Sequence, residues 1–350
     1  MPAGVRPLAI LLSGVLFATL LSATAATGQI LNGKLVDAGT GLPIDGAFIV
    51  LIGSGGLELT GVLSAEDGSF QLRAPKPGTY TLRADRIGYR STSSSPIELA
   101  ATGLADYILA VPVDAIALTG ITTEAERRCV ARPEEGLETA RLWEEARKAL
   151  SAARWTDEQH LHSYQILRYH RVLDPRSLVI MTEETESGWR RSGRPFETPP
   201  ADQLVIHGFV QVTPAGELYY APDAGILLSD AFLDTHCFGV RAGEAGLIGL
   251  AFKPLPDRSV PDVEGVLWLN ESEAELRYLE YSYTGLSFPA RMARKFGGRL
   301  EFERLPTGAW IIRRWSIRGP IRGLGGRYTA AAVQEEAGEV TEIIASRRRK

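Results

Sequence analysis

The sequence predicts a mainly β protein in which a first β domain is joined through a helix to a second, antiparallel β domain. Three observations predict this fold class. Short apolar runs separated by turn residues begin near residue 29, one stretch near residue 140 has a helical period, and strand-turn-strand patterns return after residue 160. The 36 Gly and 20 Pro, against only 3 Met, agree with a turn-rich β protein.

Size and composition limit the class of protein. A chain of 350 residues is long enough for two or three domains. With 45% hydrophobic and 23% charged residues it is an ordinary globular chain, which excludes wholesale disorder and a fibrous repeat. The formal net charge of -4 argues against a nucleic-acid partner, because proteins that bind nucleic acids usually carry a basic domain or stripe.

The first 26 residues have the pattern of a secretory signal peptide. Arg6 gives a positive start, Leu8–Leu21 is almost wholly apolar, and the small residues Ser22–Ala26 follow. The apolar run is shorter than the roughly 20 residues of a membrane span, although an uncleaved anchor helix remains the alternative. We expect cleavage between Ala26 and Thr27 or one residue earlier. The mature protein would have no transmembrane segment and would be periplasmic, outer-membrane-associated or extracellular.

Residues 27–118 form the first predicted domain. Its short apolar or alternating runs are bounded by turn residues, which is typical of an all-β sandwich or barrel. The expected strands are Ile30–Val36, Ala47–Ile52, Leu57–Leu63, Phe70–Ala74 and Tyr80–Arg83. Asp37, Asp45 and Asp67 lie at the turns and are interpreted as turn residues, because calcium loops gather several carboxylates in one short loop.

Four motifs in this domain carry a family resemblance. They are VDAGTGLPIDGA at Val36–Ala47, DGSF at Asp67–Phe70, PGTY at Pro77–Tyr80, and IGY at Ile87–Tyr89. In this order they resemble the carboxypeptidase regulatory-like domain. The resemblance implies a transthyretin-like (prealbumin-like) seven-stranded β-sandwich over about residues 29–118. It carries over no catalytic residue, and it does not extend to the second domain.

The predicted linker and helix occupy residues 119–155. Within Pro133–Ala153 the apolar residues fall on one broad face of an α-helix, including Leu142, Trp143, Ala146 and Leu150. Charged residues fill the rest of the helix surface: Glu138, Arg141, Glu144, Glu145, Arg147 and Lys148. The apolar face is expected to pack on the next domain.

Residues 156–346 form the second predicted domain, and residues 347–350 a basic tail. Short polar turns between successive runs indicate antiparallel hairpins. The expected strands are Leu161–Val172, Leu178–Thr185, Leu204–Val212, Glu217–Tyr220, Val263–Leu269, Glu275–Tyr283, Arg299–Glu303, Ala309–Ile317, Tyr328–Val333 and Val340–Ala345. Gly265–Leu269 with Glu275–Glu280 is similar to the strand-turn-strand of lipoprotein-carrier-like half-barrels, which implies a lipid-binding sheet. The alternative is a curved sheet with the helix covering one face.

The two cysteines, Cys129 and Cys237, are predicted to form one disulfide. A lone pair in an exported protein is most simply a disulfide, and the loop it would close runs over 100 residues. Neither cysteine belongs to a CxxC pair. Cys237 follows His236, but neighbouring residues on a strand point to opposite faces, which argues against a shared catalytic site.

The sequence contains no recognisable catalytic motif and predicts no cofactor. The five histidines include no HExxH pair and no His followed by Glu three residues later, and there is no Gly-x-Ser-x-Gly elbow or Walker loop. His160, His162 and His170 are the best metal candidates, since the first two could share a strand face and the third could join them. Surface or half-buried histidines are the alternative interpretation.

These observations predict an exported, non-catalytic binding or interaction protein of the cell envelope. Its partner would be a glycan, a peptide or an envelope protein. A carbohydrate-binding module is one alternative, for which Tyr80, Tyr89 and Tyr107 are the candidate aromatic platforms. An accessory or degenerate member of a metallocarboxypeptidase system is the second alternative, and a lipid or lipoprotein carrier the third.

Overall fold

The fold is known from a computed structural model that describes residues 29–100, 104–112, 118, 121, 131–191, 194–214, 216–244, 246–322 and 330–345. The predicted signal peptide with its cleavage site at Thr27, and the predicted basic tail 347–350, lie outside these residues. None of the helices in the described ranges is long and apolar enough to cross a membrane.

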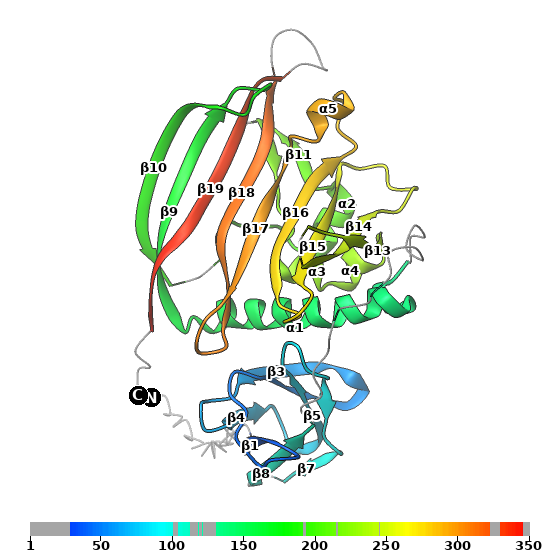
Figure 1. Ribbon diagram of the computed structural model, residues 1–350, viewed down its shortest axis with the longest axis vertical. Helices are drawn as coiled ribbons and strands as arrows, with labels where there is room; N and C mark the ends of the chain where they lie inside the picture. Colours follow the sequence, from blue (N-terminus) through cyan, green and yellow to red (C-terminus); the bar gives the residue numbers. More distant parts are fainter. Residues whose placement is uncertain are drawn as a thin grey trace, which may run out of the picture.

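The first domain is a β-sandwich of two sheets (Figure 1). In the three-stranded sheet β1 lies between an antiparallel β4 and a parallel β8. The second sheet has the order β3-β2-β5-β6, and β7 also pairs with β5. The bounds are β1 Gln29–Asp37, β2 Phe48–Ile52, β3 Glu58–Leu63, β4 Ser69–Ala74, β5 Gly78–Asp85, β6 Thr92–Ser93, β7 Ile97–Leu99 and β8 Leu104–Val111, with a 3-10 turn at Ser54–Gly56. Fully buried Leu31, Ile49, Leu51 and Leu82 form its core, so the predicted sandwich is confirmed.

The aspartates of the family motifs shape turns. Oδ1 of Asp37 accepts hydrogen bonds from the backbone N–H groups of Gly39 (2.6 Å) and Thr40 (3.2 Å). Oδ1 of Asp67 accepts one from Ser69 N (2.9 Å). Gly68 has a φ of +76°, and a Cβ there would lie 2.4 Å from the carbonyl oxygen of Leu35. The motif DGSF is therefore a structural requirement of this turn.

Helix α1 (Leu137–Gln159) follows a 3-10 turn at Pro133–Glu135 and crosses the sheet of the second domain (Figure 1). Its apolar face packs on that sheet through Leu142, Ala146 and Leu150, as predicted, and the Trp143 ring lies 6.3 Å from the Phe238 ring. Two of the charged side chains on the rest of the helix surface, Glu145 and Lys148, are buried, at 0% and 1% exposure. Their side is covered because the first domain packs against it.

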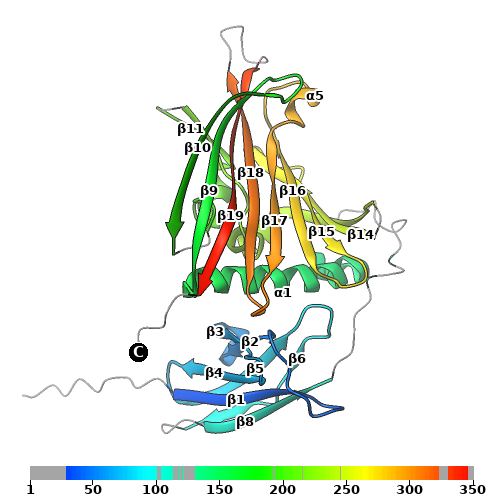
Figure 2. The same cartoon turned by 60° about the vertical axis from the view of Figure 1, so that its left-hand side comes forward.

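The second domain is built on one nine-stranded antiparallel sheet with the order β10-β9-β19-β18-β17-β16-β15-β14-β13 (Figures 1 and 2). The strands are β9 His162–Leu173, β10 Ile180–Arg190, β13 His236–Ala242, β14 Leu247–Pro254, β15 Asp262–Asn270, β16 Leu276–Thr284, β17 Gly297–Arg304, β18 Trp310–Arg322 and β19 Ala330–Ala345. One face of the sheet packs against α1, and its side chains form the large core of the domain. The antiparallel second domain is therefore confirmed.

Several elements of this domain differ from the secondary structure predicted from the sequence. The run Leu204–Val212, expected as a strand, divides into helix α2 (Ala201–His207) and strand β11 (Val210–Thr213), which pairs only with β12 (Gly216–Tyr219). Gly208, at φ +81°, separates them, because the chain must reverse there. Short helices α3 (Ala224–Leu227), α4 (Asp230–Leu233) and α5 (Ala290–Ala293) and strands β13 and β14 were not expected.

The joint between the domains is formed by α1 and two backbone loops. Nζ of Lys148 donates to the carbonyl oxygens of Arg86 (3.3 Å) and Tyr89, and Gly88 N donates to Oε2 of Glu145 (2.9 Å). Arg147 reaches Asp85 (3.3 Å) and Glu144 (2.9 Å). In Figures 1 and 2 the helix lies between the sandwich and the sheet. These contacts fix the first domain on the second.

Acid is expected to weaken this joint. Burial opposes ionisation of Glu144, but its hydrogen bond and charge interaction with Arg147 lower its pKa from 4.5 to about 2. Because the folded pKa is the lower one, the stabilisation is present above pH 4.5 and is lost as the pH falls toward 2. The urea midpoint should therefore fall over this range, and Glu144→Gln should flatten this part of the pH profile. An identical profile in the variant would contradict the assignment.

The predicted disulfide between Cys129 and Cys237 stays a prediction, because Cys129 lies outside the described residues. Cys237 is 3% exposed on β13. Arg132 pairs with Asp230 (3.3 Å) and Asp234, so the chain three residues after Cys129 lies beside the chain three residues before Cys237. Three residues span at most about 10 Å, which allows the bond. Non-reducing peptide mapping of the exported protein should find the linked pair, and alkylation of both thiols without reduction would contradict it.

Candidate functional site

The three tyrosines proposed as sugar platforms in the first domain do not form exposed platforms. Tyr80 is 5% exposed, and its hydroxyl donates to the carbonyl oxygen of Lys76 (2.7 Å). Tyr89 and Tyr107 are half-buried, Tyr89 beneath the guanidinium of Arg86 and Tyr107 against the sandwich core. The described part of the sandwich therefore offers no aromatic surface at these positions.

The histidines proposed as metal ligands are not brought together. His160 ends helix α1 in the left-handed conformation, and His162 begins β9 with a buried side chain. Burial lowers the pKa of His162. His170 is exposed, eight residues further along the strand, which corresponds to about 26 Å. Within the described ranges no group of three or more His, Cys, Asp or Glu side chains is placed to hold a metal.

A buried histidine–carboxylate pair lies elsewhere, at the start of β13. Nε2 of His236 is 3.2 Å from Oδ1 of Asp262, and its Nδ1 lies 3.0 Å from the carbonyl oxygen of Phe232. Burial opposes ionisation of Asp262, but His236 and Arg258 lower its pKa. His236 and Asp262 are 1% and 0% exposed, so no substrate reaches them. The pair joins β13 to β15 and supports the sheet.

The face of the sheet that packs on α1 is filled. Leu250, Leu267, Leu279 and Leu300 on four neighbouring strands are each buried at 0–1% exposure within the core. A half-barrel carrier would hold its lipid on such a face. The side chains that occupy it give the carrier alternative no support.

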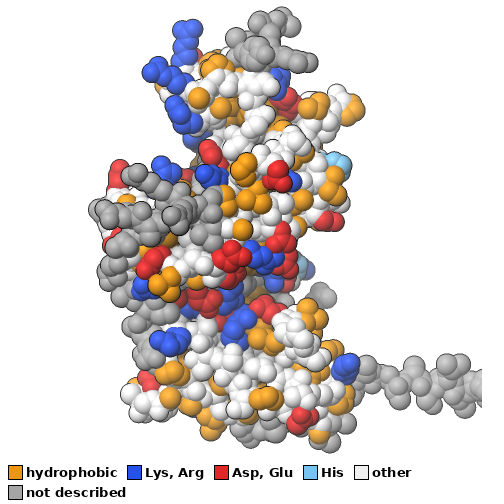
Figure 3. All heavy atoms as spheres, turned by 90° about the vertical axis from the view of Figure 1, so that its right-hand side faces the viewer, with side chains coloured by type: hydrophobic (Ala, Val, Ile, Leu, Met, Phe, Trp, Pro, Cys, Tyr) orange, Lys and Arg blue, Asp and Glu red, His pale blue; other side chains and the backbone are white. Residues whose placement is uncertain are grey.

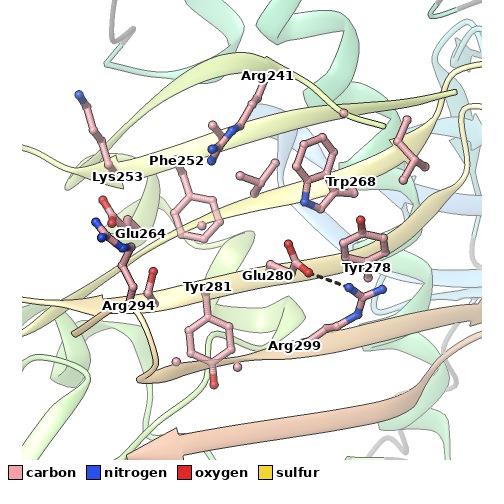
Figure 4. Close-up of a pocket in the computed structure, with 18 of the residues that line it drawn as sticks. Arg241, Phe252, Lys253, Glu264, Trp268, Tyr278, Glu280, Tyr281, Arg294 and Arg299 are labelled. Carbon is pink, nitrogen blue, oxygen red and sulfur yellow. Dashed lines mark hydrogen bonds and ion pairs between the residues drawn. The ribbon is translucent and has the colours of Figure 1, made fainter. Parts of the chain in front are cut away.

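The opposite face of strands β13 to β18 holds a groove of about 1350 Å³ (Figure 4). Strand alternation places the groove residues between the core residues, since successive side chains point to opposite faces. The floor is one row of residues that pair across the strands, in the order Gly239, Ala251, Val266, Glu280, Arg299 and Ser316. The first three are small, so the sheet surface is hollow there.

Larger side chains form the two walls. One wall is a second row of paired residues, displaced from the floor by two residues along each strand. It consists of Arg241, Gly249, Trp268 and Tyr278. On the other side lie Lys253, Glu264 and Ser282. Arg294, at the end of α5, closes the same side, and Figure 4 shows it beside Glu264.

An aromatic cluster occupies the middle of the groove. The rings of Trp268 and Tyr278 lie 6.3 Å apart at 42°. The guanidinium of Arg299 lies 3.6 Å from the centre of the Tyr278 ring and pairs with Glu280 at 2.7 Å (Figure 4). Gly249 makes room for the indole, because a Cβ there would lie 3.0 Å from it. The cluster is therefore held in place by strand pairing and stacking.

A second hollow of about 1330 Å³ continues the groove toward the first domain. It shares Leu247, Tyr278 and Arg299 with the first and reaches Asp45 and Arg86 of the sandwich. Figure 3 shows acidic and basic side chains gathered at the level of the domain joint. The sandwich thus closes the lower end of one long surface depression.

None of the groove residues was predicted as a site from the sequence. Arg241 and Arg299 are more than fifty residues apart in the chain, and only the register of the sheet places them in one depression. The strand carrying Trp268 was expected, but the strands carrying Arg241 and Lys253 were not.

Comparison with known proteins assigns the first domain. A scan against family models matches residues 30–111 to the carboxypeptidase regulatory-like domain. A search of curated proteins finds no match.

Three solved structures show weak similarity. The group B streptococcus pilus 2b backbone protein is 19% identical, with 24% of this chain and 40% of that chain covered and a TM-score of 0.22. Fervidolysin from Fervidobacterium pennivorans, a keratinolytic enzyme related to subtilisin, is 8% identical, with coverage of 73% and 28% and a TM-score of 0.19. A proposed carbohydrate binding protein from Bacteroides uniformis is 7% identical, with coverage of 69% and 99% and a TM-score of 0.21.

Scores this low carry no argument about function, and the matches span less than half of the streptococcal and Fervidobacterium proteins. The family match alone agrees with the four motifs and with the observed sandwich. The chain therefore contains a carboxypeptidase regulatory-like domain at residues 30–111, followed by a second β domain that these comparisons assign to no family.

Proposed function

We propose that this is an exported, non-catalytic binding protein of the cell envelope whose ligand lies in the groove of the second domain. One observation carries the proposal. A row of small side chains crosses β13, β14 and β15, and it is walled by Trp268, Tyr278 and exposed cations. Concave sites with aromatic walls and a few polar groups are the usual form of ligand sites. The pattern of residues 1–26 supports export.

The first domain serves as a brace in this proposal. It contributes Asp45 and Arg86 to the lower hollow, and its backbone is hydrogen-bonded to Lys148 and Glu145 of α1. Because α1 also packs on the sheet that carries the groove, the sandwich limits movement of that sheet. A rigid support keeps the walls of a binding site in place without cost at the moment of binding.

Binding is tested with the chain lacking residues 1–26, applied to immobilised glycans and peptides. Trp268→Ala should abolish retention of any ligand that the wild type retains. Trp189→Ala is the matched control, because Trp189 is 48% exposed on β10, the edge strand at the far end of the sheet from the groove. Equal loss in both variants, or no loss in Trp268→Ala, would contradict the assignment of the groove.

The non-catalytic part is tested by hydrolysis. The same protein, supplied with zinc, should not turn over C-terminal peptide or ester substrates. Turnover that is lost on adding a chelator and in His160→Ala or His162→Ala would overturn this part of the proposal and favour the metallocarboxypeptidase alternative.

A further inference from the structure

We infer that the groove binds an acidic polysaccharide, a polymer that carries both hydroxyl and carboxylate groups; this inference rests on the proposed function of the groove. Four features of the groove support this class of ligand: its excess of cations, its carboxylate Glu264 (unpaired among the described residues), its aromatic wall and its length.

The charge of the groove is opposite to that of the whole chain. Six cationic side chains line it, namely Arg241, Lys253, Arg294, Lys295, Arg299 and Arg318, against the three carboxylates Glu244, Glu264 and Glu280. The chain as a whole has a net charge of -4. Arg241, Lys253 and Arg294 are exposed, and no ion pair joins them to a carboxylate within the described ranges. Cations left unpaired in a depression attract anionic ligands.

The carboxylate of Glu264 in the groove favours a ligand that also donates hydrogen bonds. Glu264 is exposed, has no ion-pair partner among the described residues, and lies beside the cations in Figure 4. An ionised carboxylate only accepts hydrogen bonds. Every sugar unit of a polysaccharide offers hydroxyl groups that can donate to it, whereas an acidic peptide such as poly-L-glutamate offers only its backbone N–H groups. A polymer with hydroxyls and spaced acidic groups therefore matches both kinds of side chain.

The aromatic wall provides apolar contact and an unused donor. Trp268 is 9% exposed, and its indole N–H has no hydrogen-bond partner within the described structure. A buried donor without an acceptor destabilises the free protein, and a ligand oxygen that reached it would satisfy it. Tyr278 beside it is half-buried and is held under Arg299. Rings of this kind have an apolar face and a polar edge, as a sugar ring requires.

The shape of the groove suits an extended chain that is not a β-strand. Its floor crosses six strands from β13 to β18, which corresponds to about 24 Å. The floor is the face of a sheet, and β14, β15 and β16 each pair on both sides. Over these three strands a peptide would find no free strand edge for backbone pairing; the edge strand of the described sheet is β13, at one end of the groove. A ligand that lies on the floor over β14 to β16 is therefore recognised by side chains alone.

The test measures binding of polygalacturonate, neutral dextran and poly-L-glutamate to the chain lacking residues 1–26, by isothermal titration calorimetry. We expect polygalacturonate to bind, with an affinity that falls as salt rises, and the other two to bind at least about tenfold more weakly. Trp268→Ala should weaken binding about tenfold or more. The double variant Arg241→Ala with Lys253→Ala should weaken it and reduce its salt dependence. Arg73→Ala, exposed on β4 of the first domain, should change neither.

The outcomes separate this inference from the proposed function. If dextran binds with the same affinity as polygalacturonate, and Trp268→Ala weakens both, the inference of an acidic ligand is wrong. The groove is then still a binding site. If poly-L-glutamate binds as tightly as polygalacturonate, the inference that the ligand is a polysaccharide is wrong. If polygalacturonate binds and no groove variant changes its affinity, both the inference and the assignment of the groove as the binding site are wrong. Failure of all three probes overturns the inference, while the panel of glycans and peptides decides the proposed function separately.

Discussion

Lys148→Met should lower the free energy of unfolding by about 3–5 kcal/mol. The ammonium group of Lys148 is 1% exposed and lies 2.6 Å from Oε1 of Glu145, which is 0% exposed. It also donates to two backbone carbonyls of the first domain. Methionine has a similar volume but leaves a buried carboxylate without its cation and two carbonyls without a donor. Urea unfolding followed by circular dichroism measures the loss.

Two further variants identify the cause. Arg154→Ala, on the same helix, removes a 43% exposed side chain 3.8 Å from Glu158 and should change stability by less than about 1 kcal/mol. Adding Glu145→Gln to Lys148→Met should recover much of the loss, because the unpaired buried charge is then gone. A Lys148→Met protein as stable as the wild type would contradict the account of the joint.

Gly308→Ala should separate the two domains. Gly308, at the tip of the β17–β18 hairpin, has a φ of +81°, and a Cβ there would lie 2.4 Å from the Cα of Gly46 in the first domain. The three atoms nearest to this Cβ are all backbone atoms of Gly46, so the domains must move apart to admit a methyl group. We expect a larger radius of gyration by small-angle scattering.

Gly41→Ala is the matched control for this change. Gly41 has a φ of +72°, and nothing lies within 4 Å of the position that its Cβ would take. Both variants therefore carry the backbone strain of about 1–2 kcal/mol, and only Gly308→Ala carries the clash. An unchanged scattering profile in Gly308→Ala would show that the contact between Gly308 and Gly46 does not hold the domains together.

The first domain could be read from the sequence because its turns are local. The turns need Asp37 and Asp67 for their side-chain hydrogen bonds, and Gly41 and Gly68 for their positive φ. The residues of the motif are therefore sufficient to predict the turns. The apolar stripe of α1 was equally visible. The helical period could not show that the first domain covers the opposite side of the helix and buries Glu145 and Lys148.

The groove could not be predicted from the sequence for a different reason. Gly239, Ala251 and Val266 are unremarkable singly, and they form a floor only because strand register places them side by side. The segments that became β13 and β14 carried turn residues and charges, and they were not recognised as strands. Two of the aromatic residues that were predicted as sugar platforms, Tyr80 and Tyr107, pack in or against the sandwich core instead.

The most direct test of the binding site fills its floor. Ala251→Trp places a large ring on the row between Gly239 and Val266, and Ala110→Trp adds the same ring to the exposed side of β8 in the first domain. The measurement is the dissociation constant for polygalacturonate of both variants and the wild type. The account predicts at least about a tenfold loss for Ala251→Trp, with Ala110→Trp unchanged. An affinity in Ala251→Trp equal to that of the wild type would contradict the central claim that the ligand lies in this groove.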